Sequence, residues 1–147
     1  MSTDRIEKSI VLRAPRARVW RAISDAREFG TWFRAKLEGE FAPGATVRGR
    51  STYPGHEGAA MEFLIERMEP ERLFSFRWHP GAEGPTDPNE PMTLVEFRLE
   101  EIAGGTRLTV IESGFDRIAM PRRAEAFRSN DFGWSEQIKN IEAHVAA

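Results

Sequence analysis

The chain has 147 residues, of which 21 are basic and 23 acidic, so its formal net charge is −2 and its pI is near 6.0. The absence of cysteine excludes disulfides, thiolate zinc sites and cysteine nucleophiles. No basic stripe is interleaved with aromatic residues, which argues against a nucleic-acid partner. No apolar run approaches the roughly 20 residues of a membrane span. We therefore expect one soluble, cytoplasmic domain over residues 1–147.

The N-terminal part of the chain predicts a strand followed by two short helices. Apolar and polar residues alternate from Arg5 to Leu12, as they do in a strand with one buried face. The stretch "PRARVWRAISD" then places apolar residues at helical spacing, and its proline suits the first turn of a helix. A second helical stretch, "AREFGTWF", is expected to break at Gly30.

Residues 35–115 predict antiparallel strands that are separated by turn signals. Two short strands flank the Pro-Gly turn of "FAPGATV", and a hairpin turn is expected at Gly104-Gly105. The four longer strands are expected at residues 58–68, 72–79, 92–102 and 106–113. Four prolines within residues 80–91 exclude a regular strand there. This proline-rich loop either gates a cavity or simply crosses the surface.

A long amphipathic helix is predicted after Asp116. Its apolar stripe consists of Ala124, Phe127, Trp134, Ile138, Ile141 and Val145. An antiparallel sheet with one apolar face must cover that face, and this helix carries the matching stripe. The predicted fold is therefore α+β, with one strand, two short helices, an antiparallel meander of six strands and the long C-terminal helix.

Two polar residues, Asn130 and Asp131, interrupt the apolar stripe of this helix. They either cap a break in the helix before Phe132, or face the polar part of a cavity. The nearby Gly133 costs helix stability, about 1 kcal/mol relative to alanine. We expect it to let the helix pack closely against another element.

Glu112 is predicted to point into the interior. A two-residue loop at Gly104-Gly105 pairs Phe97 with Glu112. Apolar residues at positions 95, 97 and 99 alternate with charged ones, so Glu112 shares their apolar face. The predicted register of the two strands thus places a carboxyl group among core side chains.

The preceding hairpin is predicted to be aromatic on the same face. A four-residue turn at "EPER" pairs Ile65 with Phe76 and Phe63 with Trp78. A carboxylate beside such a surface is costly if it is ionised and unpaired, and burial raises its pKa. Glu112 therefore either forms an ion pair with an arginine at the rim, in a structural role, or lines a wet cavity in a functional one.

Four stretches carry a resemblance to a known family: "IVLRAPRARVWRAISDAREFGTWF", "ERLFSFRWHP", "TLVEFRLEEIAGGTRLTVIESGFD" and "NDFGWSEQIKNIEAHV". They run nearly end to end and resemble the homologues of the C-terminal domain of the activator of the heat-shock-protein-90 ATPase. That family lies within the superfamily of START domains, birch-pollen-allergen-like proteins and polyketide cyclases. The resemblance implies a helix-grip fold, in which a curved antiparallel β-sheet wraps around a long C-terminal helix and leaves a hydrophobic cavity. It also implies binding of a lipid or other apolar molecule and a role in the stress response.

The resemblance assigns no catalytic residue, because the family shares no catalytic motif. The eukaryotic activator has an additional N-terminal domain that engages the chaperone. Since this sequence begins at the first strand of the cavity domain, we expect that domain to be absent. Chaperone activation is therefore not expected.

No motif for metal or cofactor chemistry is evident in the sequence. The histidines His56, His79 and His144 lack the spacing of metal ligands, and His79 is assigned to the outer face of the sheet. There is no nucleophile elbow, phosphate-binding glycine loop or dinucleotide fingerprint. We predict no metal and no cofactor.

Three functions stay open. The first and preferred one is a non-catalytic carrier or sensor that binds a small apolar or amphipathic molecule between the sheet and the C-terminal helix. The second is a small enzyme of the cyclase or hydratase type with Glu112 as acid or base. The third is a co-chaperone-like interaction module, and a homodimer is also left open. The candidate ligand-binding residues are Trp32, Phe63, Phe76, Trp78, Phe97, Glu112, Phe127 and Trp134.

Overall fold

The computed structural model describes residues 4–81 and 89–146. The strands within these residues are β1 (Arg5–Leu12), β2 (Ala35–Glu38), β3 (Thr46–Ser51), β4 (Ala60–Glu69), β5 (Leu73–Trp78), β6 (Thr93–Ile102) and β7 (Gly105–Ser113). The helices are α1 (Arg16–Ser24), α2 (Ala26–Phe33) and α3 (Arg122–Ala146), and a 3-10 helix, η1 (Phe115–Arg117), follows β7. Most of the proline-rich loop, predicted as a gate or a surface connection, lies outside the described residues.

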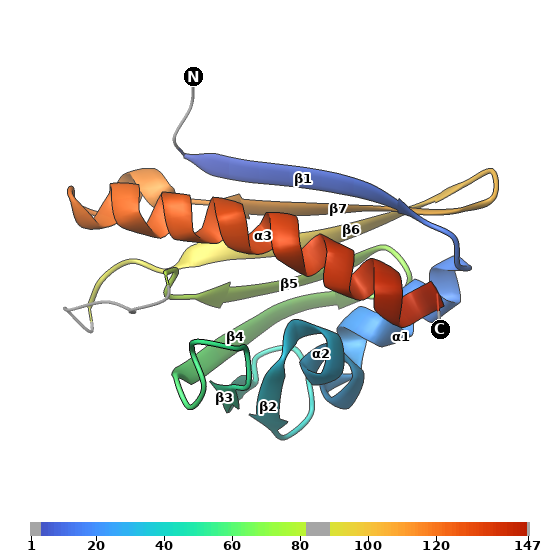
Figure 1. Cartoon of the computed structure of the whole chain (residues 1–147), viewed down its shortest axis with the longest axis horizontal. Helices are drawn as coiled ribbons and strands as arrows, with labels where there is room; N and C mark the ends of the chain where they lie inside the picture. Colours follow the sequence, from blue (N-terminus) through green and yellow to red (C-terminus); the bar gives the residue numbers. More distant parts are fainter. Residues whose placement is uncertain (1–3, 82–88, 147) are drawn as a thin grey trace.

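The strands pair antiparallel in the order β1-β7-β6-β5-β4-β3-β2. Figure 1 shows α3 lying across one face of this curved sheet, while α2 lies beside β2 and α1 lies next to α2 and the C-terminal end of α3. This is the predicted helix-grip fold, so the fold prediction is confirmed. In the described part of the chain, no helix is both long enough and apolar enough to cross a membrane.

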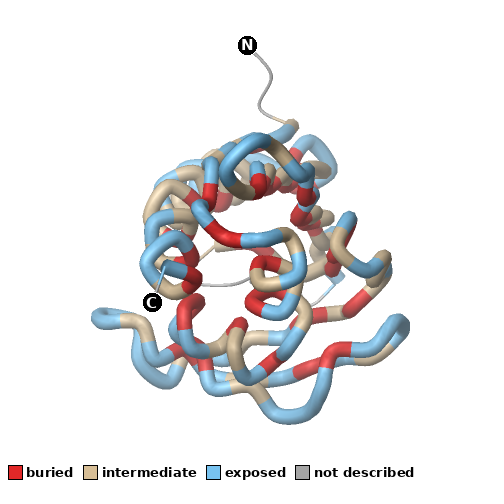
Figure 2. Tube along the Cα trace, turned by 90° about the vertical axis from the view of Figure 1, so that its right-hand side faces the viewer, coloured by how far each residue is buried: buried red, intermediate tan, exposed pale blue. Residues whose placement is uncertain are grey.

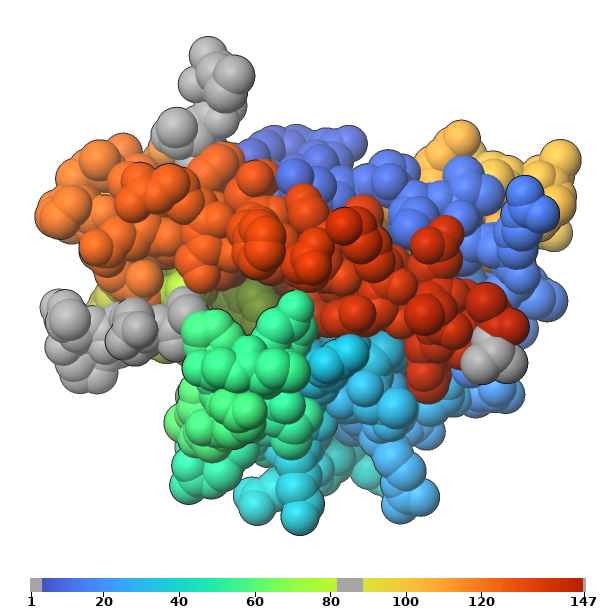
Figure 3. All heavy atoms as spheres, in the orientation of Figure 1, coloured from blue at the N-terminus to red at the C-terminus, as the bar shows by residue number. Residues whose placement is uncertain are grey.

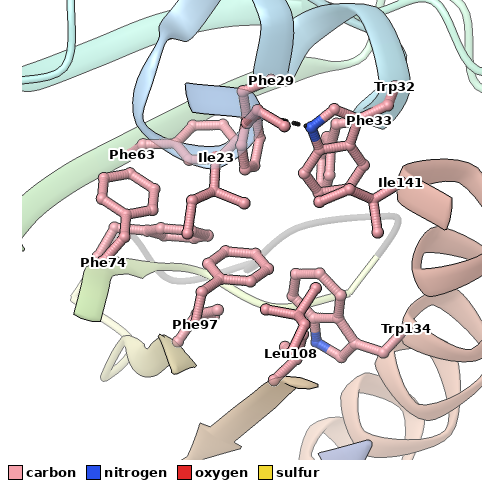
Figure 4. Packing of buried hydrophobic residues seen from close by; sticks show 14 of the residues in the cluster. Ile23, Phe29, Trp32, Phe33, Phe63, Phe74, Phe97, Leu108, Trp134 and Ile141 are labelled. Atoms are coloured by element: carbon pink, nitrogen blue, oxygen red, sulfur yellow. Dashed lines mark hydrogen bonds between the residues drawn. The ribbon is translucent and has the colours of Figure 1, made fainter. Parts of the chain in front are cut away.

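Strand alternation places large aromatic side chains on the face that α2 and α3 cover. Phe63 of β4, Phe76 of β5 and Phe97 of β6 are fully buried. The ring of Phe29, from α2, lies 5.8 Å from that of Phe63 and 6.1 Å from that of Phe97, measured between centroids. Figure 4 shows these rings converging with side chains of α3, and Figure 2 shows buried residues gathered on the inward sides of the strands and helices. Each such side chain contributes roughly 1.5–3 kcal/mol through burial.

Helix α2 begins at a side-chain cap and runs without a break through Gly30. Asp25 accepts hydrogen bonds from the backbone N–H groups of Arg27 and Glu28, at 2.9 and 3.1 Å. The predicted break at Gly30 is therefore wrong. A Cβ atom at this position would lie 2.4 Å from the carbonyl oxygen of Ala35, so glycine is needed to let β2 start directly against the helix.

The β4–β5 hairpin confirms the predicted pairing of Ile65 with Phe76. A β-bulge between Ile65 and Arg67 shifts the remaining pairs by one residue. The rings of Phe63 and Trp78, predicted as partners, lie 5.5 Å apart. The aromatic face predicted for this hairpin is thus present.

The β6–β7 hairpin has the predicted inward face but a different register. Glu112 pairs with Val95 rather than with Phe97, because the turn is one residue earlier than expected and the two strands shift by two positions. An even shift keeps every side chain on its face. Gly105 belongs to the ladder, where a Cβ atom would lie 2.1 Å from the carbonyl oxygen of Leu12. The glycine serves a close approach of β1 and not the turn.

Helix α3 is continuous across the polar interruption of its stripe. The predicted helix break at Asn130-Asp131 is therefore wrong, and Asp131 forms an ion pair with Lys8 of β1 at 3.0 Å. The expectation for Gly133 is also wrong, because a Cβ atom there would meet nothing within 4 Å. This glycine faces open space.

Candidate functional site: a buried carboxyl group beside a cavity

Glu112 lies at the centre of a network of hydrogen bonds between the sheet and α3. Trp78 Nε1 donates to Oε2 and Trp134 Nε1 to Oε1, each at 2.8 Å. Asn130 Nδ2 donates to Oε1 at 2.8 Å and to Oε2 at 3.0 Å, and the hydroxyl of Thr93 is hydrogen-bonded to Oε2. These partners come from β5, β6 and α3, so one carboxyl group joins three elements.

The carboxyl group of Glu112 has no cationic partner in the described part of the chain. It is 0% exposed and takes part in none of the ion pairs formed there. The predicted ion pair with an arginine at the rim is therefore wrong.

Burial raises the pKa of Glu112, and the hydrogen bonds from Thr93, Trp78, Trp134 and Asn130 oppose that shift. Indole and amide N–H groups can only donate. Among these four donors, only the hydroxyl of Thr93 can also accept a hydrogen bond from the O–H of a neutral Glu112. The network thus allows two protonation states of the same buried group.

Asn130 connects this network to the start of the proline-rich loop. Its amide nitrogen donates to Glu112, while its Oδ1 accepts a hydrogen bond from the backbone N–H of Gly81 at 3.0 Å. Asn130 was predicted either to cap a break in the helix or to face the polar part of a cavity, and the structure favours the second alternative. The side chain lines the cavity described next.

A cavity of about 1180 Å³ opens between the N-terminal half of α3 and the β2–β4 end of the sheet. Phe33, Met61 and Trp78 contribute apolar walls, and Asn130 and Gln137 contribute polar ones. Figure 3 shows the hollow between the orange part of α3 and the green segment that includes the β3–β4 connection. Pockets for small ligands typically measure about 300–1,000 Å³, so this cavity is large enough for one.

A family model described as "Activator of Hsp90 ATPase homolog 1-like protein" matches residues 13–146. The chain belongs to this family. None of the curated proteins matches it.

Several solved structures share the fold of this chain. MLL2253 from Mesorhizobium loti is 20% identical with a TM-score of 0.79, over 97% of this chain and 96% of that one. The Aha1 dimer from Colwellia psychrerythraea is 14% identical with a TM-score of 0.74, over 96% and 95%. DynU16, from the dynemicin biosynthetic locus, is 23% identical with a TM-score of 0.75, and the match covers 98% of this chain but 48% of DynU16. These identities establish a common fold.

The predicted site residues lie at different distances from the cavity. Trp78 lines it directly. Glu112 lies behind this wall, hydrogen-bonded to Trp78 and to Asn130, both of which line the cavity. Trp134 is 2% exposed, donates to the other oxygen of the same carboxyl group, and stacks on Trp78 with its ring centroid 5.7 Å away.

The remaining predicted residues belong to the packed interior. Trp32, Phe63, Phe76 and Phe97 are buried in the aromatic core, and Phe127 packs with its ring 5.2 Å from that of Phe115. The narrow space bordered by Trp32, Phe97 and Trp134 has no room for a water molecule. A direct contact between these residues and a ligand stays a prediction.

The structure also adds residues to this site that the sequence pattern did not single out. His79 lines the cavity, and its Nδ1 is buried without a hydrogen-bond partner among the described residues. Because β5 ends at Trp78, strand alternation does not assign His79 to either face, and its outer-face assignment stays a prediction. Arg34, at the end of α2, also borders the cavity, whereas Lys36 and Arg50 project from the outer face of β2 and β3, because Ala35 and Ser51 are the buried positions of this pair of strands.

Proposed function

We propose that this protein binds a small, largely apolar molecule in the cavity between α3 and the sheet, as a carrier or sensor. The observation that carries the proposal is the cavity of about 1180 Å³ whose wall contains Trp78 and Asn130. Both side chains are held by Glu112. Because that wall is ordered before a ligand arrives, binding loses less conformational entropy.

The composition of the cavity wall supports the same proposal. The wall combines the apolar side chains of Phe33, Met61 and Trp78 with polar groups that are already oriented, as Gln137 is by its hydrogen bond to the carbonyl of Phe33 at 2.8 Å. This combination is typical of small-molecule sites. The similarity in fold to DynU16, from a biosynthetic locus, also supports a role with a small molecule.

A cavity-filling substitution tests the proposal. Gly133 lines the cavity and faces open space, so Gly133→Trp should fill it without a clash. Ala143→Trp, at an exposed position of the same helix that does not line the cavity, is the matched control. We expect the wild type and the control to bind the uncharged probe N-phenyl-1-naphthylamine with one site, measured by fluorescence, and Gly133→Trp to bind it at least tenfold more weakly. Equal binding by all three proteins, or none by the wild type, would refute the proposal.

Native mass spectrometry of the protein as purified is the companion measurement. A co-purified molecule that is present in the wild type and in Ala143→Trp, but lost in Gly133→Trp, would identify a natural ligand. The same spectra decide whether the chain forms the homodimer left open above, as the Aha1 of Colwellia psychrerythraea does.

A second candidate function is a cyclase- or hydratase-type enzyme that uses His79. The observation in its favour is the imidazole that lines the cavity with an unpaired Nδ1 among the described residues. An imidazole is suited to proton transfer near neutral pH. The test is to incubate the co-purified molecule with wild type and His79→Asn and follow its mass. A change of one water, or an isomer separable by chromatography, formed by the wild type alone would establish the enzyme.

A further inference from the structure

The two edges of the sheet differ in length and in cover. Strands β1 and β2 are the edge strands of the sheet order. β2 has four residues, and α2 packs against its start, where the carbonyl oxygen of Ala35 would lie 2.4 Å from a Cβ atom on Gly30. β1 has eight residues, and Figure 1 shows it along the outer margin of the sheet. Natural sheets shorten or cover their edge strands because an open edge pairs with other chains. β1 is the edge without this protection.

The backbone of β1 directs one row of hydrogen-bonding groups away from the sheet. The N–H of Gly114 donates to the carbonyl of Asp4 at 3.1 Å, in line with the β1–β7 register. Successive residues of an antiparallel strand face alternate edges. The even-numbered residues of β1 therefore bond to β7, and the odd-numbered ones point their N–H and C=O groups away from it. These odd-numbered residues are Arg5, Glu7, Ser9 and Val11, all of which are exposed. No group in the described part of the chain bonds to this outward row.

The charges of residues 4–8 complement themselves when the strand is reversed. The sequence there reads Asp4, Arg5, Ile6, Glu7, Lys8. When two copies pair antiparallel about Ile6, Asp4 lies opposite Lys8 of the second copy. Arg5 then lies opposite Glu7 of the second copy. A pairing about Glu7 or about Lys8 instead sets two like charges directly opposite each other, which destabilises a sheet. The charge pattern therefore favours the pairing about Ile6.

Arg5 and Glu7 already lie side by side on the outer face of β1. Their side chains form an ion pair and are 53% and 51% exposed. In β7, the uncharged Ser113 and Ile111 stand opposite them, so β7 adds no charge to this group. Two paired copies would place each arginine between a glutamate of its own strand and one of the second copy. Such a network of four alternating charges is stronger than an isolated exposed ion pair, which contributes little.

The inward lysine of β1 does not block this pairing. A charged side chain that points inward from an edge strand normally keeps a second strand from docking. Lys8 is such a side chain, but its Nζ lies 3.0 Å from Asp131 Oδ1 of α3. Its charge is therefore balanced within the chain, and the pairing about Ile6 also brings Asp4 of the second copy opposite it.

We infer that two copies of this chain pair antiparallel through β1, about a two-fold axis at Ile6, so that their two sheets join into one. Arg5 and Glu7 of each copy then exchange backbone hydrogen bonds with Glu7 and Arg5 of the other. The same patch serves on both copies, as in closed dimers. β1 lies at the opposite end of the sheet order from the β2–β4 end that borders the cavity, so this inference is independent of the proposed function.

Opposite charge reversals test the pairing. Glu7→Arg makes both outer side chains of the patch positive, and Arg5→Glu makes both negative. Each variant alone sets like charges across the interface, whereas a mixture of the two restores arginine opposite glutamate in a heterodimer. The matched controls are Glu100→Arg and Arg107→Glu. These residues of β6 and β7 are exposed, form an ion pair at 3.1 Å and lie outside residues 4–8.

The dissociation constant of the dimer is measured by sedimentation equilibrium over a concentration series, and native mass spectrometry separates the heterodimer from the homodimers by mass. We expect the wild type and both controls to dimerise equally, and Glu7→Arg and Arg5→Glu each to dimerise at least about tenfold more weakly. The mixture should form the heterodimer with the affinity of the wild type. Added salt should reduce these differences, since salt screens exposed charges. A wild type that is monomeric throughout, variants that dimerise like the controls, or a mixture that forms no heterodimer would overturn the inference.

Discussion

Replacing Glu112 by glutamine separates the two effects that act on this buried carboxyl group. Glutamine has nearly the same shape but cannot ionise, so the variant keeps the volume of the side chain and removes its titration. It also replaces one acceptor oxygen by an NH₂ group, which would face donors: Trp134 and Asn130 on one side, or Trp78 on the other. At least one buried donor is then left without an acceptor. We expect a cost of about 1–3 kcal/mol at acidic pH, the penalty for one such group.

The pH dependence of that cost follows from the direction of the pKa shift. Burial raises the pKa of Glu112 above its ordinary value of 4.5, so the folded protein binds the proton more tightly than the unfolded chain does. The stability that this proton contributes is fully present below pH 4.5 and is lost as the pH rises from 4.5 through the folded pKa. Each unit of the shift changes the free energy of unfolding by about 1.4 kcal/mol. The cost of Glu112→Gln should therefore be largest in acid and should shrink toward neutral pH.

Urea denaturation followed by tryptophan fluorescence, repeated between pH 4.5 and 8, measures this difference. Taking wild type minus variant at each pH cancels the titration of every other group. The reasoning is refuted if the cost of Glu112→Gln grows with pH. That result would mean that the four hydrogen-bond donors outweigh burial and that Glu112 is ionised in the folded protein.

Three further sets of substitutions probe the elements around the site. Burial favours a raised pKa for Glu28, but hydrogen bonds from His144 and two arginines of α1, with the charge of one of them, lower the pKa to about 2. Its stabilising effect is therefore present above pH 4.5 and lost as the pH falls toward 2. Glu28→Gln should cost about 1–2 kcal/mol at neutral pH, after allowance for solvent screening, and less at pH 3; equal costs by chemical denaturation at both would contradict this. Gly30→Ala should destabilise the protein by about 1–3 kcal/mol through its clash with a backbone carbonyl, whereas Gly133→Ala should stabilise it by about 1 kcal/mol; thermal melts that reverse this order would refute the packing argument. Asn130→Asp should be about 3 kcal/mol less stable than Asn130→Ala at neutral pH, because it sets a second carboxylate against Glu112; the gap, measured in urea, should narrow in acid.

The inward face of the sheet could be predicted because side chains alternate with a period of two. That period placed Glu112 on the core face even though the predicted partner, Phe97, was wrong. The partner depends on where the turn lies. Gly105 was predicted to belong to the turn, but a glycine is needed there because β1 passes too close for a Cβ atom. A sequence shows that a glycine is needed but not whether the need is a turn or a close approach.

The hydrogen-bond partners of Glu112 could not be predicted in the same way. They come from β5, β6 and α3, which are far apart in the sequence. The polar interruption at Asn130 was the one signal that pointed to them, and a helix cap explained it equally well. Which aromatic residues pack together and which face a cavity also depends on how α3 lies over the sheet, and strand alternation does not determine this.

The same network explains why a cavity exists beside an otherwise well-packed core. Apolar contacts pull two elements together until no space is left between them. Near Asn130 and Gly133, α3 meets β5 through the stacked rings of Trp134 and Trp78, whose centroids lie 5.7 Å apart, and the carboxyl group of Glu112 accepts a directional hydrogen bond from each indole. Hydrogen bonds fix the distance between donor and acceptor and leave the neighbouring space unfilled. Under the proposed function, Glu112 would act on a ligand only through the residues that it positions, Trp78 and Asn130, because its own carboxyl group is fully buried.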